Sequence, residues 1–207
     1  MGERNTTLKT LVLIAFALSG MTALIFEVTW TRPLQLIFGS TIYAVSTILT
    51  TFFVGFALGS YLFRNIADKA KNPTLLFATL ELGIGLYGLI ILYLFKILPL
   101  GYLDLAGIAF AQFFLLFLIL IIPTTLFGAT WPVVNKIYSN LESIGKDSGR
   151  LYSFNSFGSF IGSLAAGFIL IPILGITSTS LLAASMNMLI AVLFFAYIKI
   201  EGGKNEN

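Results

Sequence analysis

The sequence predicts an all-α integral membrane protein, and three observations support this prediction. Hydrophobic residues make up 57% of the 207 residues and charged residues only 10%. Soluble domains contain about 45–50% apolar and about 25% charged residues, so this chain is too apolar to cover a water-facing surface. The mean hydropathy of +0.96 agrees. Several apolar stretches also reach the roughly 20 residues that a helix needs to cross the bilayer core.

The residue types exclude several kinds of chemistry. The chain contains no His and no Cys, so it cannot form a His-containing zinc site, a serine–histidine dyad or a disulfide. We expect no catalytic residue, no metal, no cofactor and no enzymatic activity. The pI near 9.2 fits the Lys and Arg bias of membrane loops, so we expect a lipid bilayer as partner and no nucleic acid.

Six apolar stretches predict six transmembrane helices, at about 10–31, 40–63, 74–96, 105–131, 149–172 and 177–198. Turn-forming Pro and Gly separate the third stretch from the fourth at 98–101 and the fifth from the sixth at Pro172 and Gly175. The first stretch continues unbroken to Phe26 without a cleavage site, so we interpret it as a retained helix and not as a signal peptide. One six-helix domain then fills 1–200, and 201–207 form a polar cytoplasmic tail.

The basic residues predict the orientation in the inner (cytoplasmic) membrane. With six spans, one side holds only Arg32 and Lys96. The other side holds Arg4, Lys9, Arg64, Lys69, Lys71, Lys136, Lys146, Arg150, Lys199 and Lys204. Ten against two is a strong positive-inside asymmetry, so both termini of this multi-pass protein are expected in the cytoplasm.

The two halves of the chain, about 10–96 and 105–198, match each other weakly. IFEVTW at 25–30 resembles LFGATW at 126–131, and a Tyr-led apolar segment at 43–59 resembles another at 152–167. Three spans per half would invert the second half, which places Trp30 and Trp131 at opposite membrane interfaces. We therefore expect a 3+3 inverted repeat, an arrangement typical of secondary transporters.

The same segments carry a family resemblance. SGMTALIFEVTWTRPLQLIFGSTIYAVSTILTTFFVGFALGSYL at 19–62, PTTLFGATWP at 123–132 and GRLYSFNSFGSFIGSLAAGFILIPILG at 149–175 resemble the membrane domain of spermidine synthase-like proteins, also called fused major-facilitator/spermidine-synthase proteins. The resemblance covers roughly residues 18–190. It implies a half-major-facilitator-like bundle and a link to polyamines. The loop IADKAK at 66–71 resembles a major-facilitator loop less closely, because Ala70 replaces its Gly.

The chain departs from that family in its chemistry. Family members often join the membrane part to an aminopropyltransferase domain, which needs a strand, a Gly-rich turn and a helix. The six spans and short loops leave no room for these elements. The resemblance therefore extends to the membrane domain, and aminopropyl transfer is not carried over to this chain.

Two acidic residues within the spans are candidates for binding a solute or a proton. Glu81 lies about 12 Å into the third helix, on the face of Gly85 and Gly88. Glu27 lies near the outer end of the first helix. Ionisable groups inside a membrane are costly and usually face a cavity or a partner. A structural hydrogen bond across helices is the alternative for both acids.

Three further residues complete the candidate binding set. Asn155 and Tyr152 open the fifth helix at a depth similar to that of Glu81, so we expect them as its partners. Arg32 either contributes to binding or ends the first helix before Pro33. Gln112 and Asn187 are expected to form hydrogen bonds between helices.

Small residues at steps of four predict close helix packing. They include Gly55 and Gly59 in the second helix and Gly158 and Gly162 in the fifth. Because six helices form half of a two-bundle transporter, we expect these stripes at the seam of a homodimer. The predicted function is a transporter half that moves a small, cationic (polyamine-like) solute. The alternative is a non-transporting membrane subunit or anchor for a separate soluble enzyme.

The topology can be tested with reporter fusions. A reporter after Asn207 should be active in the cytoplasm, and one beside Pro99 should be external, because the basic asymmetry fixes both positions. A C-terminus outside the cytoplasm would contradict the six-span topology and the inverted repeat.

Overall fold

The computed structural model describes residues 2–97, 109–140 and 142–204, and this part of the chain is helical with no strand. The predicted turn at 98–101 and the end of the tail lie outside the described residues. The elements are α1 (Gly2–Phe38), α2 (Thr41–Lys69), α3 (Pro73–Ile97), α4 (Ala109–Tyr138), α5 (Ile144–Ala165), the π-helical segment η3 (Ala166–Leu170) and α6 (Ile171–Lys204).

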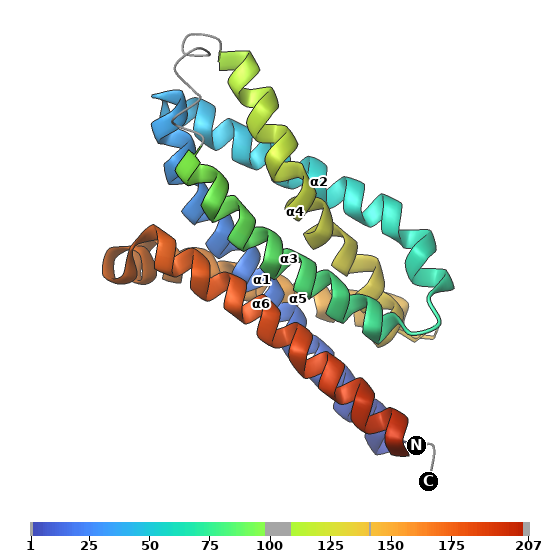
Figure 1. Ribbon diagram of the computed structural model, residues 1–207. Coiled ribbons are helices and arrows are strands. Elements are labelled where there is room, and N and C mark those ends of the chain that lie inside the picture. The colour runs from blue at the N-terminus through green and yellow to red at the C-terminus, as the bar shows by residue number, and fades with distance from the viewer. Residues whose placement is uncertain (1, 98–108, 141, 205–207) are drawn as a thin grey trace.

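Five helical segments in the described chain are long and apolar enough to cross a membrane. The fifth, Ile144–Glu201, is 58 residues long and contains α5, η3 and α6 as far as Glu201. Pro172 lies within helix, but Gly175 has φ 78° and ψ 169°, a conformation that favours glycine and breaks the helix. The chain reverses there, and α6 runs back beside α1 (Figure 1).

Three helix pairs dominate the packing. α2 packs on α4, α1 packs on α5, and α3 packs on α6. Smaller contacts join α3 to α4 and α1 to α6 and α2. The start of α1 and the end of α6 lie at the same end of the bundle (Figure 1).

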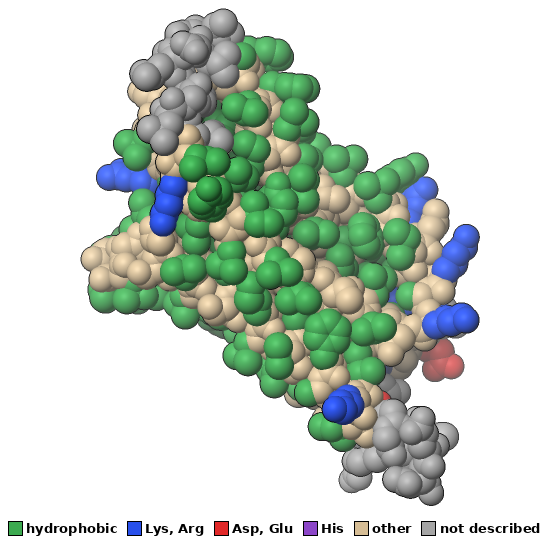
Figure 2. Space-filling view, in the orientation of Figure 1, with side chains coloured by type: hydrophobic (Ala, Val, Ile, Leu, Met, Phe, Trp, Pro, Cys, Tyr) green, Lys and Arg blue, Asp and Glu red, His purple; other side chains and the backbone are tan. Residues whose placement is uncertain are grey.

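The outer surface is hydrophobic, as expected for a protein in a bilayer. Leu36 is 82% exposed, Phe168 79% and Phe110 76%. Figure 2 shows Lys and Arg side chains near the two ends of the visible face, with hydrophobic side chains over most of the length between them. Soluble monomers rarely expose apolar patches of such extent, so the surface supports an integral membrane protein.

One prediction about the outer part of α1 is wrong. Pro33 lies inside α1, which continues to Phe38, so the exposed Arg32 does not end the helix. Trp30 is buried at 1% exposure and stacks on Phe26, with ring centroids 4.9 Å apart. Trp30 is therefore part of the helix-packed core, and its ring does not face lipid.

Gly55 and Gly59 bring α2 close to α4. A Cβ atom on Gly55 would overlap Thr124, and one on Gly59 would overlap the backbone carbonyl of Thr125. Both glycines are buried, whereas most other residues of α2 are exposed. These two residues therefore set the distance between the axes of α2 and α4.

Gly158 and Gly162 likewise allow α5 to pack closely on α1. A Cβ atom on either would overlap a backbone carbonyl of α1, at Ala17 or Met21 respectively. Close helix packing at the predicted glycines is therefore present, but all four glycines face helices of their own chain. This corrects the expectation that they form a homodimer seam, because no free surface remains at these positions.

Pro123 lies within α4 without breaking it. Proline lacks the N–H that would bond to the carbonyl of Ile119, four residues earlier. The Tyr87 hydroxyl of α3 donates a hydrogen bond to this carbonyl at 3.1 Å. In a bilayer no water can satisfy such a group, so the neighbouring helix supplies the missing donor.

Pro132, at the other end of α4, also removes a backbone donor from the helix. The carbonyl without an intrahelical donor belongs to Gly128, and the Ser60 hydroxyl of α2 donates to it at 3.0 Å. Hydroxyl groups from two different helices thus allow α4 to continue from Ala109 to Tyr138 with two internal prolines.

The bond from Tyr87 can be tested with a double-mutant cycle. Tyr87→Phe leaves the Ile119 carbonyl without a donor and should lower the free energy of unfolding in detergent by about 1–2 kcal/mol. Pro123→Ala restores the intrahelical donor, so Tyr87→Phe should cost clearly less in that background. Equal costs in both backgrounds would show that the hydroxyl does not compensate for the proline.

Candidate functional site

Glu81 is fully buried where α3 meets α1 and α6. Its exposed fraction is 0%, and neither carboxyl oxygen has a hydrogen-bond partner. Two glycines on the same face bring the helices together. A Cβ atom on Gly85 would lie 2.8 Å from Met188 Cγ of α6, and one on Gly88 would lie 2.6 Å from Phe26 Cζ of α1. The predicted small-residue face therefore meets other helices and not lipid.

Three buried polar residues of α1 and α6 lie on the side of these helices that meets α3, and we call them and Glu81 the polar cluster. Ser19 of α1 faces the Glu81 carboxyl, although not at hydrogen-bonding geometry. The Thr22 hydroxyl donates at 2.8 Å to the side-chain oxygen of Asn187 in α6 and lies 2.9 Å from the Ser19 carbonyl. All three are at most 2% exposed. The predicted cross-helix role of Asn187 is confirmed.

The chemistry of the polar cluster follows from the lack of a counter-charge. No Lys or Arg of the described chain forms an ion pair with Glu81. An isolated carboxylate at such depth costs several kcal/mol, so a proton or a cation must accompany the carboxyl group. The hydroxyl oxygen of Ser19, which faces the carboxyl group, can help to hold a cation. No three His, Cys, Asp or Glu side chains of the described residues form a metal-binding group.

Asn155 and Tyr152 do not meet Glu81, which corrects the predicted partnership. The Asn155 amide donates at 2.8 Å to the Phe16 carbonyl, on the side of α1 that faces α5. Tyr152 is 65% exposed, with its ring 6.1 Å from that of Trp131. Similar depth in the membrane was the basis of the prediction, but depth does not tell which face of α1 each residue approaches.

Glu27 and Arg32 lie away from the polar cluster. Glu27 is half-buried, two helical turns or about 12 Å along α1 from Ser19. Arg32 is exposed. The described chain shows no ion pair between them. The structure therefore leaves Glu81 as the one candidate acid with full burial.

Ser19 and Thr22 were missed by the sequence analysis. The signal was their spacing of three residues within an apolar span, which places both hydroxyls on one face of α1. A single Ser or Thr in a span usually bonds to its own backbone, so only the position of Asn187 on a neighbouring helix distinguishes Thr22.

A second polar surface lies on the exposed faces of α2 and α5. Thr50 of α2 and Ser156 of α5 are exposed, and no hydrogen bond of their hydroxyls appears among the described residues. Tyr43 and Tyr152 are more than half exposed on the same faces. Polar side chains on a membrane helix usually face protein or a water-filled cavity, so these two faces differ from a purely lipid-facing surface.

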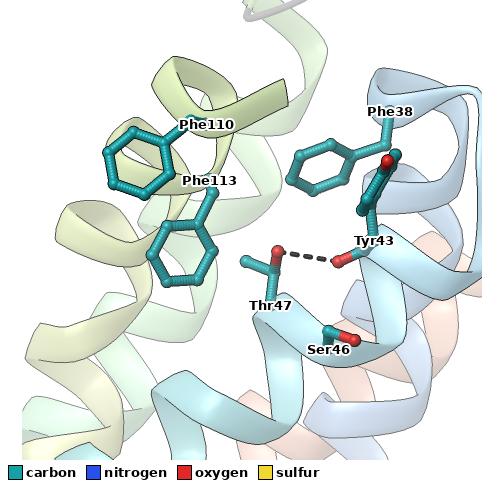
Figure 3. Close-up of a pocket in the computed structure, with 6 residues that line it drawn as sticks. All are labelled: Phe38, Tyr43, Ser46, Thr47, Phe110 and Phe113. Carbon is teal, nitrogen blue, oxygen red and sulfur yellow. Dashed lines mark hydrogen bonds between the residues drawn. The ribbon is translucent and has the colours of Figure 1, made fainter. Parts of the chain in front are cut away.

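An aromatic cavity of about 410 Å³ lies at one end of this surface. Phe110 and Phe113 of α4 line one side, and Phe38 and Tyr43 lie opposite (Figure 3). The Thr47 hydroxyl donates at 2.7 Å to the Tyr43 carbonyl. None of the described residues that line the cavity is charged, so this lining suits an apolar group and not a cationic solute.

Comparisons with protein-family models, curated proteins and solved structures find no match to the chain. The functional argument therefore depends on the packing, the polar cluster and the exposed polar faces.

Proposed function

We propose that the chain is one half of a secondary transporter, built from six membrane spans as a 3+3 inverted repeat. A span needs about 20 residues, so the 58 residues of Ile144–Glu201 suffice for two crossings, one on each side of Gly175. With the four preceding helices this makes six. The basic asymmetry supports an orientation with both termini in the cytoplasm.

The packing pattern supports the repeat. An inverted repeat relates α1 to α4, α2 to α5 and α3 to α6. Under this exchange the α1–α5 pair becomes α4–α2, and the α1–α6 pair becomes α4–α3. All four pairs pack in the structure, and α3–α6, which maps onto itself, is also a major pair.

The two halves also use the same contact between their helices. In α2, Gly59 packs on the α4 backbone and the next residue, Ser60, donates to the Gly128 carbonyl at 3.0 Å. In α5, Gly158 packs on the α1 backbone and Ser159 donates to the Gly20 carbonyl at 3.1 Å. The two Gly–Ser pairs do not occupy equivalent positions in the matching segments at 43–59 and 152–167. The halves therefore share this kind of helix contact and not the exact sequence positions.

The exposed faces of α2 and α5 support a homodimer. Polar residues such as Thr50 and Ser156 would face lipid in a monomer, whereas a second copy would cover them. In a two-fold symmetric dimer the same surface patch of each copy forms the interface. The dimer seam proposed here uses the outer faces of α2 and α5, because their glycine faces are already packed inside the chain.

Glu81 carries the functional proposal. Its full burial without an ion pair favours coupling to a proton or a cation. The polar cluster lies between α1, α3 and α6, away from the outer faces of α2 and α5, so we assign Glu81 to proton coupling and not to direct contact with the solute. The resemblance to spermidine synthase-like membrane domains makes a polyamine the first solute to test.

A membrane anchor for a soluble enzyme is the alternative function. The hydrogen bonds between the end of α4 and the start of α5 favour it, because the Asp147 carboxylate accepts them from the Asn140 N–H at 3.0 Å and the Ser143 hydroxyl at 2.8 Å. Exposed Lys136 and Lys146 lie on the same two helix ends and could dock an acidic partner. An anchor requires no transport and no titrating residue at Glu81.

Single cysteines can test the dimer, since the parent chain contains none. Phe53 of α2 and Phe157 of α5 are 71% and 63% exposed, and Tyr93 of α3 is 65% exposed. Phe53→Cys and Phe157→Cys chains placed in one membrane should crosslink, whereas Tyr93→Cys chains should not. Crosslinking of Tyr93→Cys alone would place the seam on α3 and contradict the proposal.

Uptake into proteoliposomes tests the transport function. The parent should take up a radiolabelled polyamine in a pH-dependent way. Glu81→Gln removes the titrating group but keeps its size, so it should abolish uptake or its pH dependence. Because no buried cation loses a partner, its free energy of unfolding should change by about 1 kcal/mol or less.

Glu27→Gln is the matched control, because it removes a half-buried acid of α1 that lies outside the polar cluster. It should retain the pH dependence of the parent. Full pH-dependent uptake by Glu81→Gln would remove Glu81 from the mechanism. No uptake of any amine by the stable parent would favour the anchor.

A further inference from the structure

The turn between α2 and α3 contains a cavity that the proposed function does not use. Its volume is about 670 Å³. Lys69 and Lys71 line it together with the polar side chains of Asn65 and Asn72. Ile66 and Leu75 add apolar surface from the adjoining turns of the two helices. The cavity is thus polar and basic on one side and apolar on the other.

The polar side of this cavity has positive charge and no internal counter-ion. Both lysines are exposed, and no ion pair involves them in the described chain. Asp68 of the same turn does not line the cavity. The Asn72 side chain accepts a hydrogen bond from the Leu75 N–H at 3.0 Å at the start of α3, and the positive end of the helix dipole adds to the field of the lysines. An anionic group is the complementary ligand.

The apolar side of the cavity adjoins exposed apolar surface of α2 and α3. α2 and α3 diverge from their short turn, and α4 packs against both (Figure 1). Ile66 is 49% exposed and Leu75 42% exposed. Leu86 and Ile90, farther along α3, are each 48% exposed. An apolar surface therefore continues from the cavity along the length of the bundle.

We propose that this cavity binds the headgroup of an anionic phospholipid, with its acyl chains along the diverging faces of α2 and α3. A phosphate group accepts charge-assisted hydrogen bonds from lysines, and basic pockets between membrane helices can hold such headgroups. The apolar continuation favours a lipid over a soluble phosphate, because a soluble anion would leave that surface without a partner. The basic end of the bundle fits the anionic cytoplasmic leaflet.

Native mass spectrometry in detergent can test the proposal without the electrostatic field of a membrane surface. The protein is titrated with phosphatidylglycerol and, separately, with phosphatidylcholine. Phosphatidylglycerol should bind more tightly. Lys69→Gln combined with Lys71→Gln should weaken its binding about tenfold or more, since each lysine supplies a hydrogen bond to a charged group.

Lys136→Gln combined with Lys146→Gln is the matched control, because it removes the same charge from the neighbouring basic turn. This variant should bind phosphatidylglycerol like the parent. Equal losses in both double variants, or no preference for phosphatidylglycerol, would overturn the proposal. Complete displacement of the lipid by free glycerol phosphate at equal concentration would assign the site to a soluble anion. None of these outcomes depends on transport, so the proposed function is tested separately.

Discussion

Close contact between helix backbones is the constraint on which the rest of the fold depends. In a bilayer the hydrophobic effect does not drive helices together, so van der Waals contact and interhelical hydrogen bonds must hold the bundle. The glycine positions of α2 and α5 meet the backbones of α4 and α1 directly. These contacts bring Ser60 and Ser159 within reach of backbone carbonyls on the facing helix, so close packing and polar bonding are consequences of the same residues.

The second constraint is that backbone groups within the bilayer need partners in the protein. Pro123 and Pro132 each remove one donor from α4, and hydroxyls of α3 and α2 replace them. These two bonds fix α4 against both neighbours at defined heights. The irregular sequence of α4 therefore specifies how the first half of the chain packs on the second.

The sequence predicted the helices well and their mutual arrangement less well. Hydropathy located the long apolar helices because a bilayer requires such stretches, and the turn-forming Gly175 located the break within the last of them. Hydropathy could not show that α1 continues through Pro33, since the effect of a proline depends on donors from other helices. The burial of Glu81 followed from its small-residue face. The partner of Asn155 could not be predicted in the same way. The rotation of each helix about its axis is set by tertiary contacts, and the pattern of a single helix does not contain them.

The position of α1 links the polar cluster to the proposed dimer seam. One side of α1 carries Ser19 and Thr22 toward α3 and α6, and another side accepts the Asn155 amide at the Phe16 carbonyl and the Ser159 hydroxyl at the Gly20 carbonyl. Packed backbones cannot slide past each other without breaking these bonds, so α1 and α5 must move as one body. A proton or cation that binds or leaves at Glu81 would change the interaction of this body with α3 and α6. Because the outer face of α5 is half of the proposed seam, the same movement would alter contact with the second copy, which is the coupling that the proposed transport function needs.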